Sequence, residues 1–257
     1  MISLLQTSDG IRFGMAGGKP GCPSPTLFIF STTLEESLES PKFSQCGEML
    51  KSQGFLLAAL DLPGHGQNRR EGDPENALSV WRARMEKGDP VVPSFLAQAS
   101  RVLDHLIAEG LADPLKVSAC GTSRGGFMAL HWMAAEARVQ RVAAFAPVTH
   151  LLALREFDGA ACHPTVNAMA LVRQADRLAG RPIWICIGNH DLRVDTHEAV
   201  AFVRSVTAAS LVRNVTADIE LRIQPSLEHS ILAGSHTEAA AWLLDRMRGG
   251  KPQMHPR

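Results

Sequence analysis

Short apolar runs alternate along this chain with longer segments whose apolar residues recur every three or four positions. In the segment 93–111, for example, Phe95, Val102 and Leu106 would line one face of a helix. Short apolar runs bounded by Gly and Pro are instead typical of buried strands. Strands alternating with helices predict an α/β fold, with a mostly parallel central sheet and helices on both faces. The predicted strands are 26–31, 55–60, 115–120, 142–146, 182–187 and 219–223, and the predicted helices are 93–111, 125–137, 195–209 and 237–247.

The size and composition of the chain fit one globular domain. Of its 257 residues, 45% are hydrophobic and 20% are charged, and no repeat or linker divides them, so residues 1–257 are expected to form a single domain. Two stretches, 69–90 and 150–180, interrupt the alternation and are expected to pass over one end of the sheet. The second is longer than an ordinary loop. We expect a small cap there, with a helix near 166–178 and a partly apolar pocket wall from 151–158.

Charge and cysteine content narrow the classes of partner and compartment. The 26 basic and 26 acidic residues balance, which gives no electrostatic reason to expect a nucleic acid or an anionic membrane as partner. No stretch has the length and apolar character of a membrane-spanning helix, and the first residues do not resemble a secretory signal peptide. The five cysteines are scattered without a C-x-x-C pair, so neither a disulfide framework nor a zinc knuckle is expected. These features favour a cytoplasmic protein.

The segment Gly121-Thr-Ser-Arg-Gly125 matches the pattern G-x-S-x-G, and its surroundings strengthen the match. It follows the apolar run 115–120 and precedes a helical segment, which together predict a strand, a tight turn and a helix. Such a turn strains the backbone of the serine and requires small neighbours, here Gly121, Gly125 and Gly126. The start of the helix favours negative charge developing near Ser123. We therefore expect Ser123 to be a nucleophile, the alternative being a glycine-rich turn with an incidental serine.

A family resemblance supports this interpretation. The segment from Gly121 to His131 resembles the nucleophile elbow of α/β-hydrolases in the dienelactone hydrolase and prolyl-oligopeptidase-like branch. The run Asp61-Leu-Pro-Gly-His-Gly66 is similar to the loop after the second core strand in that superfamily. The resemblance extends from about Thr26 to the C-terminal helix. It implies an α/β-hydrolase fold with a small lid insertion, and a serine hydrolase whose acid and then base follow the nucleophile along the chain.

The acid is expected in the loop after the apolar run 182–187. A serine hydroxyl becomes a good nucleophile only when a histidine takes its proton and a carboxylate holds that imidazole in place. The loop Gly188-Asn-His-Asp-Leu-Arg-Val194 is similar to the family's G-x-x-D-x-x-V loop, which implies that Asp191 is the acid. Asp195 is the alternative, although at the start of a predicted helix it is more naturally an N-cap.

A metal site is another interpretation of the same loop. His190, Asp191, Asp195 and His197 are all competent ligands. Their spacing matches no metal motif, however, and catalytic and capping roles account for them. We therefore expect no metal and no other cofactor.

The base is expected in the loop after the last predicted strand. His229 lies there, in Gln224-Pro-Ser-Leu-Glu-His229, where the family places its catalytic histidine. Glu228 departs from the small residue that often precedes this histidine. His236, seven residues further on, is the alternative base. Of the remaining histidines, His65 is expected to line the site. The others are expected to be structural or exposed: His105, His131, His150, His163 and His255.

Two backbone N–H groups are expected to stabilise the negatively charged oxygen that forms during the reaction. One is that of Arg124, directly after the nucleophile, and the other comes from the loop after the strand 26–31. That loop reads Ser31-Thr-Thr-Leu-Glu, so Thr33, or Thr32 if the register shifts, is the second donor. The chain contains no tyrosine, which rules out the tyrosine hydroxyl that prolyl oligopeptidases use for this purpose.

The expected activity is hydrolysis of small carboxylic esters through an acyl-enzyme, so the expected partner is a small-molecule ester. A prolyl-oligopeptidase-like peptidase is the first alternative, although the chain is short for that family's propeller and shows no acidic motif suited to a substrate amine. The second alternative is a hydrolase fold that binds a ligand or partner without catalysis, against which the Ser, Asp, His order argues. The acyl group, the alcohol and the oligomeric state do not follow from the sequence.

Overall fold

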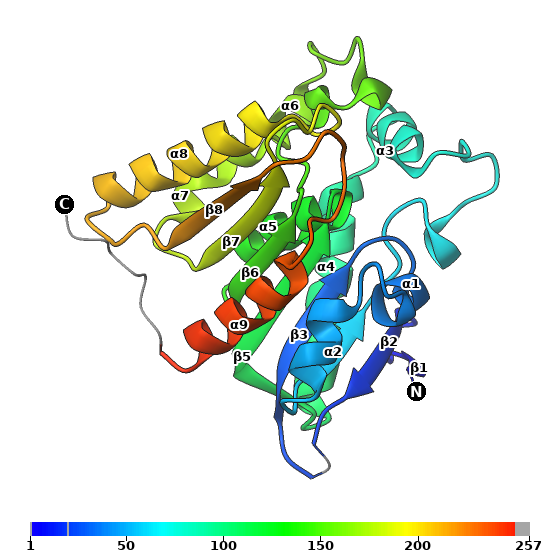
Figure 1. Ribbon diagram of the computed structural model, residues 1–257. Coiled ribbons are helices and arrows are strands. Elements are labelled where there is room, and N and C mark those ends of the chain that lie inside the picture. The colour runs from blue at the N-terminus through cyan, green and yellow to red at the C-terminus, as the bar shows by residue number, and fades with distance from the viewer. Residues whose placement is uncertain (1, 20, 250–257) are drawn as a thin grey trace.

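The computed structural model describes residues 2–19 and 21–249, so His255 lies outside the described residues. The described part forms one eight-stranded sheet flanked by helices (Figure 1). The strands are β1 (Ser3–Gln6), β2 (Arg12–Gly17), β3 (Ser24–Phe30), β4 (Leu56–Ala59), β5 (Ala112–Thr122), β6 (Val139–Phe145), β7 (Ile183–Gly188) and β8 (Ile219–Gln224). They lie in the order β1-β2-β4-β3-β5-β6-β7-β8. Only the β1–β2 and β2–β4 pairs are antiparallel, which confirms the predicted mostly parallel sheet.

Helices cover both faces of this sheet, as the alternation of elements predicts. None in the described ranges is long and apolar enough to cross a membrane. One face packs against α1 (Leu34–Glu39), α2 (Gln45–Lys51) and α9 (Ser235–Met247), and the other against α4 (Val91–Ala108), α5 (Arg124–Ala135) and α8 (Thr196–Val212). The shorter elements are α3 (Ala77–Glu86), α6 (Pro164–Ala168), α7 (Ala175–Leu178) and the 3-10 turns η1 (Gly66–Asn68), η2 (Leu151–Ala153), η3 (Arg155–Phe157) and η4 (Leu171–Gln174).

The central strands are apolar on both faces because both faces are covered. In β3, Phe28 and Phe30 belong to the core on the side of α4 and α5, and the rings of Phe30 and Phe95 meet edge to face at 5.1 Å. Leu27 and Ile29 point the other way, into the core under α1, α2 and α9. Side chains alternate along a strand, so a strand buried on both faces has a continuous apolar sequence.

The N-terminal hairpin of β1 and β2 is not predicted from the sequence. All the residues of β1 are exposed, and Gly14 and Gly17 interrupt the apolar character of β2. A Cβ at Gly14 would lie 2.9 Å from the Cδ1 atoms of both Leu34 and Leu38. The glycine that obscures the strand pattern therefore lets α1 pack closely on β2.

The segment 150–180 differs from its prediction in two respects. The expected helix near 166–178 is broken into α6, η4 and α7, since the N–H of Leu171 donates to the carbonyl of Thr149 (2.9 Å) instead of continuing the helix. The expected pocket wall at 151–158 is also not apolar as predicted. Leu151, Leu154 and Phe157 lie in the main core, at most 1% exposed, and Leu152 is half-buried against it.

The two irregular stretches lie at the same end of the sheet and hold each other there. Arg82 of α3 donates through Nη1 to the backbone oxygens of Glu156 (3.0 Å) and Asp158 (2.5 Å). Asn76, the N-cap of α3, donates to Oε1 of Glu156 (3.3 Å). Figure 1 shows α3, α6 and the loop after β8 at this end. Loops at the carboxyl ends of parallel strands are where ligand sites form in open α/β sheets.

Candidate active site

Ser123 lies at the sharp turn between β5 and α5, in a backbone conformation that side-chain-bearing residues rarely adopt (φ 54°, ψ −114°). Small residues make the turn possible. A Cβ at Gly125 would lie 1.8 Å from the carbonyl oxygen of Phe30, and one at Gly121 would lie 2.3 Å from the carbonyl carbon of Gly125. These approaches bring the start of α5 against the end of β3. The turn therefore has the strained geometry that the G-x-S-x-G pattern predicts.

Asp191 is held in the loop after β7 with its carboxylate 0% exposed. Its Oδ1 accepts the backbone N–H groups of Arg193 (3.0 Å) and Val194 (3.2 Å), which fixes the plane of the carboxylate. Burial alone would raise the pKa of Asp191. The hydrogen bond and charge of His229, together with the two backbone donors, outweigh burial and lower that pKa. Asp191 is thus a buried carboxylate held in its charged form.

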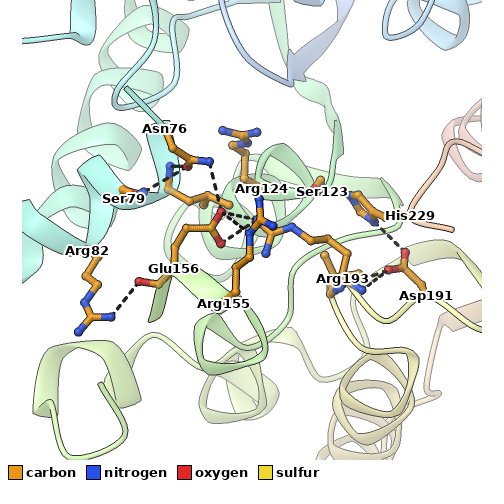
Figure 2. A network of polar contacts seen from close by, with 12 residues as sticks. Asn76, Ser79, Arg82, Ser123, Arg124, Arg155, Glu156, Asp191, Arg193 and His229 are labelled. Atoms are coloured by element: carbon orange, nitrogen blue, oxygen red, sulfur yellow. Dashed lines mark hydrogen bonds and ion pairs between the residues drawn. The ribbon is translucent and has the colours of Figure 1, made fainter. Parts of the chain in front are cut away.

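His229 joins Ser123 to Asp191 from the loop after β8 (Figure 2). Its Nδ1 lies 2.7 Å from Oδ2 of Asp191, and its Nε2 lies 3.0 Å from Oγ of Ser123. The loop is tied to the end of β7, because the N–H of Ser226 donates to Oδ1 of Asn189 (3.0 Å). A carboxylate only accepts, so Nδ1 carries the proton and leaves Nε2 free to accept from the serine hydroxyl.

His236, the alternative base, and Asp195, the alternative acid, have structural roles. His236 accepts the N–H of Cys46 at Nδ1 (3.3 Å) and donates from Nε2 to the carbonyl of Lys42 (3.2 Å), so it fastens α9 to the start of α2. Burial lowers the pKa of His236, in keeping with a neutral imidazole. Asp195 caps α8 by accepting the N–H of His197 (2.8 Å). The structure brings neither His236 nor Asp195 into the hydrogen-bonded chain at Ser123.

The side chains of His190, Asp191, Asp195 and His197, the alternative metal ligands, do not form a metal site. Asp191 bonds His229, and Asp195 bonds the backbone at the start of α8. Across residues 2–19 and 21–249, no group of three or more His, Cys, Asp and Glu side chains is placed to hold a metal ion.

The expected oxyanion donors lie at two chain segments that meet beside Ser123. Arg124 is the first residue of α5, so its backbone N–H has no partner within the helix. Thr33 is the N-cap of α1, three residues after the end of β3, and its hydroxyl accepts the N–H of Glu36 (3.1 Å). Asp61 secures this region, since its carboxylate accepts the N–H groups of Leu34 (2.9 Å) and Gln67 (3.0 Å). One carboxylate therefore joins the loop after β3 to the loop after β4.

Charged side chains gather next to the nucleophile. Arg193 donates through Nη2 to both carboxylate oxygens of Glu156, each at 2.8 Å, whereas Nη1 of Arg124 donates to Nε2 of His65 (3.1 Å). Burial, followed by the charge of Arg124, lowers the pKa of His65 to about 4. Burial and the charge of Arg193 lower the pKa of Arg124, an effect that Glu156 and Glu36 partly oppose. The sequence pattern predicts that His65 lines the site, but it gives no sign of the Glu156–Arg193 pair, whose partners are 37 positions apart.

A pocket of about 420 Å³ opens beside His229. It is lined by Lys42 and Gln45, by 229–234 from the loop after β8, and by His236 and Thr237 of α9. Its lining is mixed in character, since Ile231 and Leu232 are apolar and Lys42 is cationic. The hydrogen-bonded histidine thus has an open space next to it.

Comparisons with known proteins agree with this fold. A cold-adapted esterase from an Arctic intertidal metagenomic library is 18% identical, with a TM-score of 0.69 over 95% of this chain and 92% of its own. A puromycin-hydrolyzing peptidase from Mycobacterium tuberculosis is 14% identical, with a TM-score of 0.70 over 99% of this chain but only 40% of its own. TT1662 from Thermus thermophilus is 17% identical, with a TM-score of 0.68 over 96% of this chain and 98% of its own. No curated protein sequence matches significantly.

The family match is more specific than these structural likenesses. Sequence identities this low show the shared α/β-hydrolase fold alone. The model of the prolyl oligopeptidase family, in contrast, matches residues 41–247, most of the chain, including the G-x-S-x-G turn and the loops after β7 and β8. The chain therefore belongs to the prolyl oligopeptidase family and is a serine hydrolase with the α/β-hydrolase fold.

Proposed function

We propose that this protein is a carboxylic-ester hydrolase of small substrates, with Ser123 as nucleophile, His229 as base and Asp191 as the acid that orients it. The observation that carries the proposal is the unbroken chain of hydrogen bonds from Ser123 Oγ through both imidazole nitrogens to Asp191. Nucleophile, base and orienting group within hydrogen-bond reach of one another are the geometric signature of nucleophilic catalysis by serine.

The reaction proceeds in two displacements. As Ser123 Oγ attacks the ester carbonyl, its proton passes to Nε2 of His229, and the imidazolium is stabilised by Asp191. The tetrahedral intermediate collapses, the C–O bond to the alcohol breaks, and Nε2 returns the proton to the departing alkoxide. Water then repeats the sequence on the acyl-enzyme, which releases the carboxylic acid and restores Ser123.

Two backbone N–H groups stabilise the negative oxygen of each intermediate. Those of Arg124 and Thr33 are the proposed donors, since one opens the helix after the nucleophile and the other lies in the segment that the Gly125–Phe30 contact brings beside it. Thr32 is the alternative to Thr33. Donors held by the fold need no reorganisation as charge develops, and a single such donor contributes about 2.7–4 kcal/mol to catalysis.

The carboxylates near Ser123 favour an esterase over a peptidase, because they are already engaged in hydrogen bonds. A peptidase that binds a substrate's free amine needs a carboxylate available to it. Glu156 is instead taken up by both hydrogen bonds from Arg193, and Glu36 accepts from the hydroxyl of Thr32. The pocket beside His229 provides room for the alcohol, because the histidine must protonate the leaving oxygen.

A substrate panel tests the proposal. Wild-type protein and Ser123→Ala are assayed on p-nitrophenyl esters of increasing acyl length and on aminoacyl-p-nitroanilides. We expect turnover of short esters that Ser123→Ala abolishes, together with labelling of the wild type by a fluorophosphonate probe. Cleavage of the anilides in preference to every ester would identify a peptidase, and absence of both turnover and labelling would identify a non-catalytic binding protein.

A further inference from the structure

The guanidinium of Arg124 lies next to the nucleophile without an acidic partner. Among the described residues its hydrogen bond is to the imidazole of His65, and no carboxylate forms an ion pair with it. Several other arginines are paired with carboxylates, for example Arg193 with Glu156 and Arg84 with Asp73. A partly buried cation that no side chain neutralises is costly to maintain, so its presence at the nucleophile calls for an explanation.

His65 orients this guanidinium without neutralising it. Arginine has no acceptor atom, so Nε2 of His65 must be the unprotonated nitrogen and must accept from Nη1 of Arg124 (3.1 Å). The lowered pKa of His65, about 4, agrees with a neutral ring. The bond occupies one of the five N–H donors of Arg124 and leaves the others for a ligand.

The other charged groups nearby leave a net positive site. Arg193 and Glu156 cancel each other in a two-hydrogen-bond pair. Glu36, whose carboxylate accepts from the hydroxyl of Thr32, acts on Arg124 only at longer range. Arg69 adds positive charge beside His65. An anion bound at Arg124 would therefore meet one guanidinium directly and little competing negative charge.

The position of Arg124 indicates which part of the substrate it meets. His229 must protonate the leaving oxygen, so the alcohol departs on the side of His229. In Figure 2, Arg124 and His229 lie on opposite sides of Ser123. A group bound by Arg124 therefore belongs to the acyl part of the ester.

We propose that Arg124 binds a carboxylate at the far end of the acyl group, so that the substrates are half-esters of short dicarboxylic acids. The inference rests on the proposed esterase function and narrows its substrate class. A guanidinium fits a carboxylate with two parallel hydrogen bonds, which gives direction as well as charge recognition. His65 is the positioning residue that holds the guanidinium toward the site.

A matched pair of substrates tests this inference. p-Nitrophenyl hemiglutarate and p-nitrophenyl valerate have acyl chains of the same length, and only the first ends in a carboxylate. We expect wild type to have the higher kcat/KM for the hemiglutarate. Arg124→Gln should lower the ratio of hemiglutarate to valerate by about ten- to a hundredfold, the contribution of a hydrogen bond to a charged group. Arg124→Lys should restore part of the ratio, and Arg101→Gln, whose side chain is 63% exposed and pairs with Asp9, should leave it unchanged.

A second measurement needs no variant at Arg124. Glutarate should inhibit valerate hydrolysis by wild type competitively and at least tenfold more strongly than the neutral glutaramide. Valerate hydrolysis with equal inhibition by the two compounds, or with an unchanged ratio in Arg124→Gln, would overturn the inference while the esterase function stands. Hydrolysis of neither ester would overturn both.

Discussion

Replacement of Asp191 by Asn should abolish ester turnover without unfolding the protein. In the native site Oδ1 accepts two backbone N–H groups and Oδ2 accepts the Nδ1 proton of His229. In Asp191→Asn the amide oxygen takes over the two backbone bonds, which turns the NH₂ group toward His229. Two donors cannot face each other, so the imidazole must move its proton to Nε2. That nitrogen then no longer accepts from Ser123, and the expected loss in kcat is about 10⁴, or about 5.4 kcal/mol.

Asp195→Asn is the matched control, because it makes the same chemical change four positions along the chain. Asn is as good an N-cap as Asp and tolerates the positive φ of 62° at this position, so both stability and turnover should be close to wild type. Steady-state kinetics on a short p-nitrophenyl ester and thermal unfolding measure the two effects. Near-wild-type turnover in Asp191→Asn would refute the reasoning, and loss of turnover in Asp195→Asn alone would assign the acid to Asp195.

Three further predictions follow from the packing around the site. His236→Ala removes both bonds that fasten α9 to the start of α2, so thermal unfolding should show a loss of about 1–3 kcal/mol, while kcat falls by less than about tenfold. A pronounced loss of kcat like that expected for His229→Ala would instead make His236 the base. Gly125→Ala places a methyl group 1.8 Å from the carbonyl oxygen of Phe30, so the variant should be insoluble or unfold well below wild type; a Tm within a few degrees of wild type would contradict this. Burial lowers the pKa of His131 to about 4, against about 6.5 when unfolded, despite the opposing bond to the Met169 carbonyl. The unfolded state then binds more protons between these values, so the stability is full above pH 6.5 and declines toward pH 4. Urea unfolding at pH 7 and pH 5 should show a smaller decline in His131→Phe than in wild type, and an equal decline would disprove the assignment.

The parallel part of the sheet could be read from the sequence because burial on both faces leaves a strong local signal. β3 and β7 are continuous apolar runs, and each ends in a loop whose polar residues are close to it in sequence. The turn of Ser123 and the loop of Asp191 could be located in the same way, since they follow β5 and β7. The choice of Asp191 over Asp195 within that loop came from the resemblance to the family's G-x-x-D-x-x-V loop. Local patterns of this kind do not depend on knowing the rest of the fold.

Contacts between distant segments give no such signal. The exposed strand β1 has no apolar pattern, and the break between α6 and η4 depends on a hydrogen bond to Thr149, about twenty positions earlier. The apolar residues of 151–158 fit a pocket wall as well as a core, and only the packing of η2 and η3 decides between them. The pairing of Glu156 with Arg193, and the lack of such a partner for Arg124, likewise appear only in three dimensions.

The backbone conformation that presents Ser123 as a nucleophile lowers the stability of the fold. A residue with a side chain at φ 54°, ψ −114° raises the free energy of the folded state by about 1–3 kcal/mol. The turn is nevertheless held, because the N–H of Ser123 donates to Phe145 and its carbonyl accepts from Phe127 and Val148. Ser123→Gly would relieve the strain and remove the nucleophile in one step. A search for thermostable variants of this protein that does not also select for turnover would therefore favour inactive molecules at this very position.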